Sequence, residues 1–574
     1  MIFALYKQNP PLLKSIVFII ILLNFGINSS AQNFKLKIIG NSSFEDKTID
    51  SLGYNSDHKN DKSIYEETNK LSGKLSKIGF IENHTLLISK ANDSSYVSKF
   101  DIGKRTKNIH IYIGRNSTIN KQLSLNLKED TLTLSYIEIE TFLNNTIQKL
   151  EQKGFSFAQL KLIHLKQKNN SLFADLQYES SQERKMNSIV LKFEENNTKT
   201  QFPEGAFKQL TKKYKNKSFN QNLVKQINVD FEKFRFVNQT KYPEILFTKD
   251  TTKVYVYLEK RKSNLFDGFI GFSNTKNNKI NFNGYIDLTL ENALQAGEQL
   301  LLFWKSDGKN QKTFKASVDF PYLFKSPIGL KAQINIFKQD SLFQNTKTAI
   351  DLGYIIDYNT RIYLGYQSTE SSSTQKTNNG VISDFKSSFI TINFEHTKTD
   401  VVNIIFPVKT NISLSIGNGK REVIDLGEKN NQFYINLEFM HNFYLNRKNC
   451  VNINYHNYFL QSNSYVINEL FRLGGFRSIR GFTENSLQAN LASIITSEYR
   501  YILSPDLYIH SIMDYGYFQD KTTNSNGHLR TIGLGFGVKT KNGLLKLALA
   551  NGSLNKQEFN FNNSIIHVNY TVLF

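Results

Sequence analysis

The sequence has a single cysteine, Cys450, among its 574 residues, so it cannot form the internal disulfide framework that staples small extracellular modules. It also has only eight prolines. Proline cannot donate a hydrogen bond to a sheet ladder, so a low proline content is what long, regular strands require. After residue 31, no apolar run approaches the roughly 20 residues that a membrane-spanning helix needs. These scarcities favour a chain that is built mainly from long strands.

Motifs of catalysis and of metal binding are missing from the sequence as well. It contains no G-x-S-x-G, no H-E-x-x-H, no phosphate loop and no cluster of cysteine or histidine at metal-ligand spacing. Its ten histidines are scattered along the chain. We therefore expect a protein that is not an enzyme and that uses no metal or other cofactor.

The net charge of +21 comes from 71 basic and 50 acidic residues that are spread over the whole chain. No basic cluster interleaves with an aromatic stacking platform, so nucleic acid is not an expected partner. A positive excess suits anionic lipid, and lipopolysaccharide is a candidate partner. The sequence is rich in phenylalanine (45) and tyrosine (28), which suit strands in general and the interfacial girdles of membrane barrels in particular.

The beginning of the chain has the pattern of a secretory signal peptide. Lys7 and Lys14 are basic, Ser15–Phe25 is almost wholly apolar, and small residues follow at Ser29 and Ala31. We expect residues 1–31 to be removed by cleavage between Ala31 and Gln32. The apolar run is too short to span a bilayer, which argues against the alternative of an uncleaved anchor.

Residues 33 to 262 repeat a short mixed pattern three times, in which an amphipathic helix precedes two strands. Two of the expected helices end on a glycine and an aromatic residue, Gly79-Phe80 and Gly154-Phe155, and glycine just past a helix end is the usual left-handed cap. Each helix has an apolar face that can cover one side of a small sheet. We therefore predict three small α/β modules, at residues 32–115, 116–184 and 185–262.

From residue 263 to the end, strands with a period of two follow one another and helical periodicity disappears. In the last segment the apolar positions share one face: Ile566, Val568, Tyr570, Val572 and Phe574. About sixteen candidate strands fit into residues 263–574, and bacterial outer-membrane barrels use an even number of strands. We predict a membrane β-barrel of about 16 antiparallel strands, with Tyr570 and Phe574 as its C-terminal barrel signal. The alternative is a large soluble sandwich or propeller.

The segment "LGGFRSIRGF", Leu473–Phe482, combines glycines, arginines and phenylalanines within one loop near residues 462–489. A sixteen-stranded barrel leaves an aqueous lumen, so a long loop can fold inward. Arg480 would then need a carboxylate on the inner wall, and the following strands offer Glu498 and Asp514. Two alternatives stay open: Arg480 is exposed to solvent, or Glu498 pairs only with Arg500 on its own strand.

These motifs resemble a known family. Ile479-Arg480-Gly481-Phe482, followed by Ile512-Met513-Asp514-Tyr515-Gly516, is similar to the motifs of the outer-membrane protein assembly and secretion barrels of the BamA, TamA and FhaC type. Ile512 replaces the aromatic residue that is usual in the strand motif. The resemblance implies an inward loop whose arginine pairs with the aspartate of the strand motif. It also implies polypeptide-transport-associated (POTRA) modules of β-α-α-β-β order in the periplasm.

The resemblance implies a factor that inserts or translocates unfolded outer-membrane or secreted clients. Its lateral seam would lie between the first barrel strand, with Gly268 and Gly271, and the last, with Val572, because glycine supplies no side chain to pack. The implied location is the outer membrane, with accessory periplasmic or lipoprotein partners. A dedicated two-partner-type secretion pore for one exported protein and a passive surface-antigen barrel remain as alternatives.

Overall fold

The structure is a computed structural model that describes residues 33–123, 129–179, 182–193, 202–274, 280–307, 311–340, 342–373, 382–400, 403, 405–541, 543–555 and 557–574. The expected signal peptide, residues 1–31, lies outside the described residues. The chain divides into two compact units. One holds the first two modules, and the other holds the third module together with the barrel.

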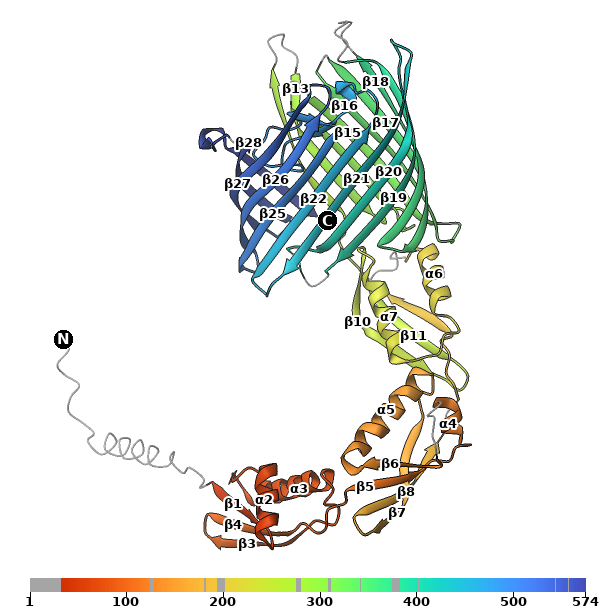
Figure 1. The fold of residues 1–574 in the computed structure, drawn as a ribbon, viewed down its shortest axis with the longest axis vertical. Helices are drawn as coiled ribbons and strands as arrows, with labels where there is room; N and C mark the ends of the chain where they lie inside the picture. Colours follow the sequence, from red (N-terminus) through yellow and green to blue (C-terminus); the bar gives the residue numbers. More distant parts are fainter. Residues whose placement is uncertain are drawn as a thin grey trace, which may run out of the picture. The chain divides into compact units, whose positions relative to one another are not determined.

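The first module is a four-stranded sheet of order β2-β1-β4-β3 with two helices packed on one face (Figure 1). Its core consists of buried aliphatic side chains such as Ile49 of the first helix and Ile64, Leu71 and Leu75 of the second, which recur on one helical face. The elements are β1 (Phe34–Ile39), α2 (Ser43–Leu52), β2 (Asp57–His58), α3 (Asp61–Lys77), β3 (His84–Asn92) and β4 (Ser95–Asp101).

The second module repeats this topology, with strand order β6-β5-β8-β7. Its elements are β5 (Asn108–Tyr112), α4 (Thr118–Leu123), β6 (Thr131–Ser135), η1 (Tyr136–Glu138), α5 (Ile139–Gln152), β7 (Gln159–Lys168) and β8 (Ser171–Glu179). The predicted boundary at residue 115 needs correction, because β5 pairs with β6 and β8 and not with the first sheet. The first sheet ends at Asp101, so the boundary falls between residues 101 and 108.

The third module has three strands in the order β10-β11-β9 and two helices. Its elements are β9 (Ser188–Phe193), α6 (Glu204–Tyr214), α7 (Gln221–Glu232), β10 (Val237–Phe247) and β11 (Thr252–Lys260). In all three modules the first strand lies parallel to the last, and the last is antiparallel to the one before it. Pairing of this kind leaves the penultimate strand (β3, β7 or β10) at an edge of each sheet.

Sixteen antiparallel strands close into a barrel, as the sequence predicted. They are β12 (Leu265–Asn274), β13 (Ile280–Glu291), β14 (Gln299–Ser306), β15 (Gln311–Leu323), β16 (Ile328–Gln339), β17 (Phe343–Asp357), β18 (Thr360–Ser373), β19 (Phe385–Thr399), β20 (Val408–Val423), β21 (Glu428–Tyr444), β22 (Asn449–Gln461), β25 (Leu491–Ser504), β26 (Leu507–Asp520), β27 (Ser525–Lys539), β28 (Gly543–Leu554) and β29 (Ile565–Leu573).

None of the helices in the described ranges is long and apolar enough to cross a lipid bilayer.

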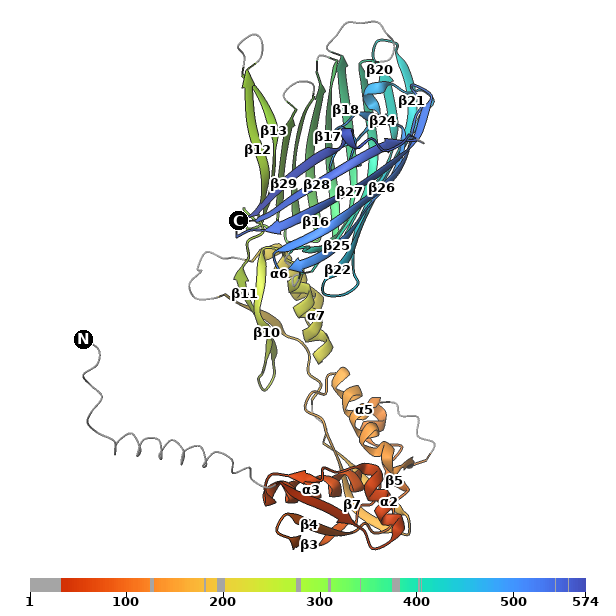
Figure 2. The same cartoon turned by 90° about the vertical axis from the view of Figure 1, so that its left-hand side faces the viewer.

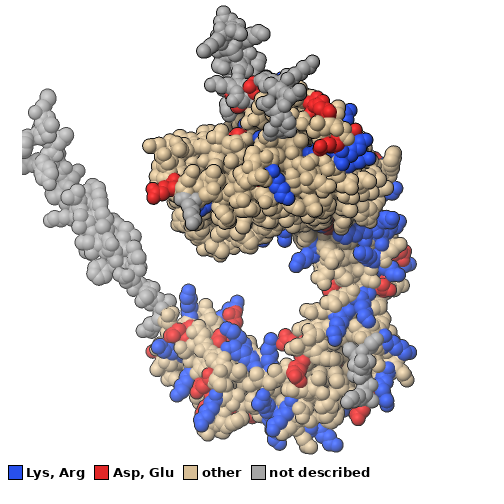
Figure 3. All heavy atoms as spheres, turned by 45° about the horizontal axis from the view of Figure 1, so that its top comes forward, with Lys and Arg blue, Asp and Glu red and all other residues tan. Residues whose placement is uncertain are grey.

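The two faces of the barrel wall differ in chemistry. On β17, Ile350, Leu352 and Tyr354 are more than half exposed on the outer face, whereas Asp351 between them is buried on the inner face. The wall visible in Figure 3 is accordingly a broad band with few charged residues, whereas charges cover the modules. Apolar side chains directed outward suit lipid, and polar side chains directed inward suit a water-filled lumen.

The third module is fixed to one rim of the barrel. Phe234 and Phe236 contact Tyr358 of the β17–β18 turn, at ring-centroid distances of 4.5 and 5.9 Å. Arg235 forms an ion pair of 3.1 Å with Glu291 at the end of β13. These contacts combine buried aromatic area with a charge-assisted hydrogen bond, so we expect the module and the rim to move as one body.

Asp230 in α7 makes the stability of the third module dependent on pH. Burial alone would raise the pKa of this carboxyl group, but hydrogen bonds from Lys213, Lys233 and Tyr214 hold its pKa below the usual value. Because the pKa is lower in the folded state, this stabilisation is complete above the unfolded-state pKa of about 3.9 and is lost as pH falls through the folded-state pKa.

We therefore expect backbone amides of α6 and α7 to lose protection in the full-length protein at about pH 3, relative to pH 7, after correction for intrinsic exchange. Hydrogen exchange with mass spectrometry measures this loss. Asp230→Asn should cost about 1–3 kcal/mol at neutral pH and show a smaller response to acid, since its amide does not titrate. Asp250→Asn, at an exposed turn, is the control and should behave as the wild type. An equal acid response of Asp230→Asn and wild type would contradict the assignment.

Candidate functional site

The segment between β22 and β25 forms a loop that lies inside the barrel. Within it, the short strands β23 (Phe471–Leu473) and β24 (Leu487–Ala489) pair with each other, so the segment between them is a closed tip. The tip contacts side chains on the inner face of the first barrel strands: Arg477 pairs with Asp287 of β13, and Glu484 with Lys305 of β14 at 3.0 Å. The loop therefore crosses the lumen from the C-terminal wall to the N-terminal wall.

Arg480 lies at the centre of this loop and is 4% exposed. Its Nε and Nη2 donate to the two carboxylate oxygens of Asp514 on β26, at 2.9 and 2.5 Å. Its Nη1 donates to Glu498 on β25, and its backbone carbonyl accepts from Thr531 at 2.7 Å. The guanidinium is thus held in a fork geometry by two carboxylates. The structure brings the predicted arginine and both predicted partners together.

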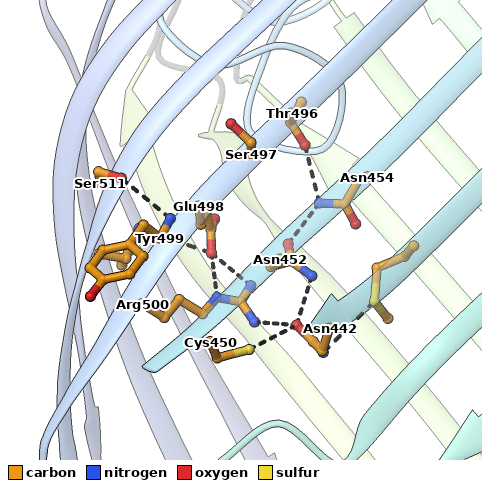
Figure 4. Close-up of polar contacts among 12 residues, drawn as sticks. Asn442, Cys450, Asn452, Asn454, Thr496, Ser497, Glu498, Tyr499, Arg500 and Ser511 are labelled. Atoms are coloured by element: carbon orange, nitrogen blue, oxygen red, sulfur yellow. Dashed lines mark hydrogen bonds and ion pairs between the residues drawn. The ribbon is translucent and has the colours of Figure 1, made fainter. Parts of the chain in front are cut away.

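Glu498 accepts hydrogen bonds from two arginines, Arg480 and Arg500. In the structure it therefore does not pair with Arg500 alone, and Arg480 is not exposed to solvent. One carboxylate oxygen accepts from Arg480, and the other accepts from Arg500 Nε at 2.7 Å. Arg500 also donates to Asn442 Oδ1 at 2.9 Å (Figure 4). The Arg480 site therefore continues along the inner wall into a polar network that spans β21, β22 and β25.

The rest of the loop motif fills gaps in the wall. Ile479 is fully buried and packs over the bare Cα of Gly516, where an added Cβ would lie 3.4 Å from its side chain. Gly481 has a φ of 74° and rests on Gly552 of β28, so a Cβ on Gly481 would come within 2.5 Å of the Gly552 nitrogen. Phe482 packs beside this contact and against the same apolar cluster as Ile479. Glycine is required at position 481 both for its backbone conformation and for this close approach.

A second buried ion-pair site, besides that of Arg480, fixes the loop, and the sequence analysis missed it. Glu469 of the loop accepts from Arg421 Nη1 of β20 at 2.5 Å, and from Gln432 Nε2 at 2.8 Å. Arg421 has no exposed surface. Asn468, next to Glu469, donates to Ser371 at 2.7 Å. The only sequence feature that could have indicated this pair is an arginine at an inward position of a strand, and such a residue has no distinct pattern.

Arg421→Met should loosen this end of the loop, because it leaves the Glu469 carboxylate buried without its cationic partner. We expect tryptic cleavage of the folded protein at Arg472, inside the loop, to become at least about tenfold faster, as a loss of about 1.4 kcal/mol or more implies. Mass spectrometry of the fragments measures this rate. Lys420→Met removes an exposed charge from the adjacent position and should leave the rate unchanged. Equal rates for Arg421→Met and wild type would show that the pair does not hold the loop.

The first and last barrel strands are joined over a short length only (Figure 2). In their described parts, β12 and β29 share three residue pairs, Leu265–Leu573, Phe266–Val572 and Asp267–Thr571, whereas β12 and β13 share ten. Asn569 adds a side-chain hydrogen bond to Asp267. Most of the facing edges of β12 and β29 therefore have no ladder partner in each other.

The predicted seam residues differ in where they lie. Val572 lies in the seam and pairs with Phe266. Gly268 follows the last paired residue of β12, and its bare Cα faces β13, where an added Cβ would meet the Tyr285 carbonyl oxygen at 2.5 Å. Gly271 pairs with Asn283 of β13 and has no partner on β29. At the C-terminus, Tyr570 and Phe574 are exposed on the outer face, as expected for contact with lipid.

Beneath the loop, the lumen encloses a cavity of about 1220 Å³ that is lined by residues of the wall and of the loop. Within the described parts of the chain, no three acidic, histidine or cysteine side chains are grouped so that they could hold a metal ion.

Neither a family model nor a curated protein matches the sequence. Among solved structures, CdiB from Escherichia coli is 12% identical with a TM-score of 0.51, and the match covers 92% of this chain and 98% of that chain. CdiB from Acinetobacter baumannii is 13% identical with a TM-score of 0.50, over 79% and 86% of the two chains. BamA from Haemophilus ducreyi lacking POTRA domains 1–3 is 15% identical with a TM-score of 0.46, over 80% and 98%. With its closed sixteen-stranded barrel and small α/β modules, the chain shares the fold of the two CdiB structures.

Proposed function

We propose that the protein is an outer-membrane assembly or translocation factor, which engages unfolded clients through periplasmic modules and passes them to a lateral seam of the barrel. The observation that carries the proposal is the Arg480 site. A passive barrel has no evident need for a loop that is drawn across its lumen and held there by two buried carboxylates. In this proposal, residues 1–31 are removed as a signal peptide. The expected partners are membrane lipid, unfolded clients, lipopolysaccharide and accessory periplasmic or lipoprotein factors.

The modules support the first step, which is capture of an extended segment. Each sheet has a penultimate strand at its edge, and unpaired backbone groups at an edge can accept an added strand. On β3, Leu86 and Leu87 are 47% and 59% exposed, and on β7, Leu165 is 58% exposed. An apolar side chain beside a free edge suits an unfolded client, because the client can bury apolar residues while its backbone pairs.

The seam supports the second step, which is insertion. Unpaired backbone in hydrocarbon costs several kcal/mol per group, so a strand cannot enter lipid without a pairing partner. The short junction between β12 and β29 is the part of the ladder that opens with the loss of the fewest hydrogen bonds. An open edge there would template the first strand of a client.

A dedicated secretion pore is the second candidate, and the lumen cavity favours it. If the loop leaves its site, a cavity of this size offers a route through the barrel for one exported chain. The two functions predict different consequences for the cell.

Depletion of the protein followed by quantitative proteomics of the outer membrane distinguishes these functions. An assembly factor predicts a joint decrease of many barrel proteins in the membrane. A secretion pore predicts the loss of one or a few proteins from the medium, with the barrel proteins unchanged. No change in either fraction would support the passive surface-antigen barrel and reject both proposals.

A further inference from the structure

One side of the lumen wall carries lysines without acidic partners. Lys315 of β15 and Lys347 of β17 project from the same inner face, and both are in register with Asn335 on the strand between them. Among the described residues, no carboxylate lies within ion-pair distance of either lysine. Each ammonium group lies over an aromatic ring, Phe303 for Lys315 and Tyr434 for Lys347, at 5.9 Å from the ring centroid.

Two further cations without an ion pair in the described structure line the same cavity. Arg472 projects from the loop and lies 5.6 Å from the ring of Phe343, and Lys546 projects from β28. The other lysines and arginines that line the cavity are in ion pairs: Arg235, Lys305, Arg477, Arg480 and Arg500. Against the four unpaired cations stands one lining carboxylate of the described residues that has no lysine or arginine partner, Glu438, which lies 3.8 Å from His456. The cavity therefore has an uncompensated positive charge, and such charges act strongly inside low-dielectric walls.

The size and the other lining groups indicate the kind of anion. A volume of about 1220 Å³ exceeds the roughly 300–1,000 Å³ of ordinary small-molecule sites, so the cavity can hold part of a polymer. Asn335 lies between the two lysines, and the wall beside Lys347 carries further side-chain amides and aromatic rings, among them Asn345, Gln367 and Phe389. Amides both donate to and accept from a peptide backbone, and aromatic rings cover its side chains.

We propose that this cavity binds an acidic, extended polypeptide segment, whose carboxylates pair with Lys315 and Lys347 while its backbone contacts the neighbouring amides. The inference deepens the proposed function, on which it rests: the bound segment would belong to a client that enters the lumen. Arg472 belongs to the same site, because the loop carries this arginine to the lysine-bearing wall.

Binding of synthetic peptides to the full-length protein in detergent micelles tests the proposal. The probes are twelve-residue glutamate–glycine and lysine–glycine peptides with a neutral fluorophore, followed by fluorescence anisotropy. We expect the acidic peptide to bind and the basic peptide not to bind, with an affinity for the acidic peptide that falls as salt is raised. Lys315→Gln/Lys347→Gln should weaken binding at least tenfold.

The matched control is Lys312→Gln/Lys338→Gln, which removes the same charge from the same region of the wall, on side chains that are exposed on its other face. This control should bind as the wild type. Equal affinity in the two double variants would overturn the proposal. Displacement of the peptide by dextran sulfate, with tighter and lysine-dependent binding of the sulfated polymer, would also overturn it in favour of an anionic polysaccharide.

The outcome is separable from that of the proposed function, because peptide affinity is measured without client insertion. If the lysine variants bind as the wild type while depletion still lowers many barrel proteins, only the lumen site is rejected. If acidic peptide binds through the lysines and depletion changes nothing, the lumen site stands and the assembly function is rejected.

Discussion

Replacement of Arg480 by alanine is expected to free the inward loop and to abolish client handling. The substitution leaves the carboxylates of Asp514 and Glu498 buried side by side, and only Glu498 retains a cation, Arg500. Removal of one member of a buried ion pair typically costs about 3–5 kcal/mol. That cost corresponds to a more than 100-fold shift of the loop from its docked to its released state.

Limited proteolysis of the folded, membrane-embedded variant measures this shift, because the released loop exposes Arg472 to trypsin. In cells, the variant should fail to complement depletion although its barrel is present in the membrane. Arg477→Ala is the matched control: its ion pair with Asp287 is more than half exposed on the arginine side, and pairs of that kind contribute about 0–1 kcal/mol. If the Arg480→Ala and Arg477→Ala variants were cleaved at Arg472 at the same rate, the Arg480 site would not hold the loop.

A disulfide across the seam is expected to stop client insertion completely and reversibly. Phe266 and Val572 are register partners on the outer face, so cysteines at these positions face each other across the junction of β12 and β29. The variant is Phe266→Cys/Val572→Cys in a Cys450→Ser background, which removes the buried native thiol. Oxidation should block insertion of a barrel client into proteoliposomes, and reduction should restore it.

The control disulfide joins Ile350 and Tyr366, which are register partners on β17 and β18 and are also exposed on the outer face. It imposes the same kind of link on a ladder that the mechanism does not open. Full insertion activity of the oxidised seam variant would reject lateral opening and leave the lumen as the route. Equal inhibition by both disulfides would mean that the whole wall must deform.

The sequence indicated the barrel and the Arg480 site because both depend on local patterns. Apolar and polar residues that alternate with a period of two predict one apolar and one polar face for each strand, whichever strands it pairs with. The motif around Arg480 contains Gly481, the glycine that the close contact with Gly552 requires. The carboxylates could be predicted because they lie on the strands that follow the loop, at inward positions.

Features that depend on distant pairing escaped prediction. Arg421 and Glu469 lie on separate segments, and nothing in either segment indicates that they meet. The first helices of the first and third modules, α2 and α6, are only 10 and 11 residues long, so each shows its apolar stripe over few turns. The strand β5 was assigned to the first module because its pairing with β8, about sixty residues later, decides its sheet and is not visible locally.

The two buried ion-pair sites of the loop have opposite polarity, and this has a consequence for biogenesis. At one end a loop anion meets a wall cation, at Glu469 and Arg421, and at the other a loop cation meets wall anions. A loop docked backwards would bring Arg480 toward Arg421, so the charges permit one orientation. The partners lie on β20, β25 and β26, and Gly481 rests on β28, so the loop cannot dock until the C-terminal strands have assembled. Docking would thus act as a checkpoint that completes only when the last hairpins of this protein's own barrel have formed in correct register.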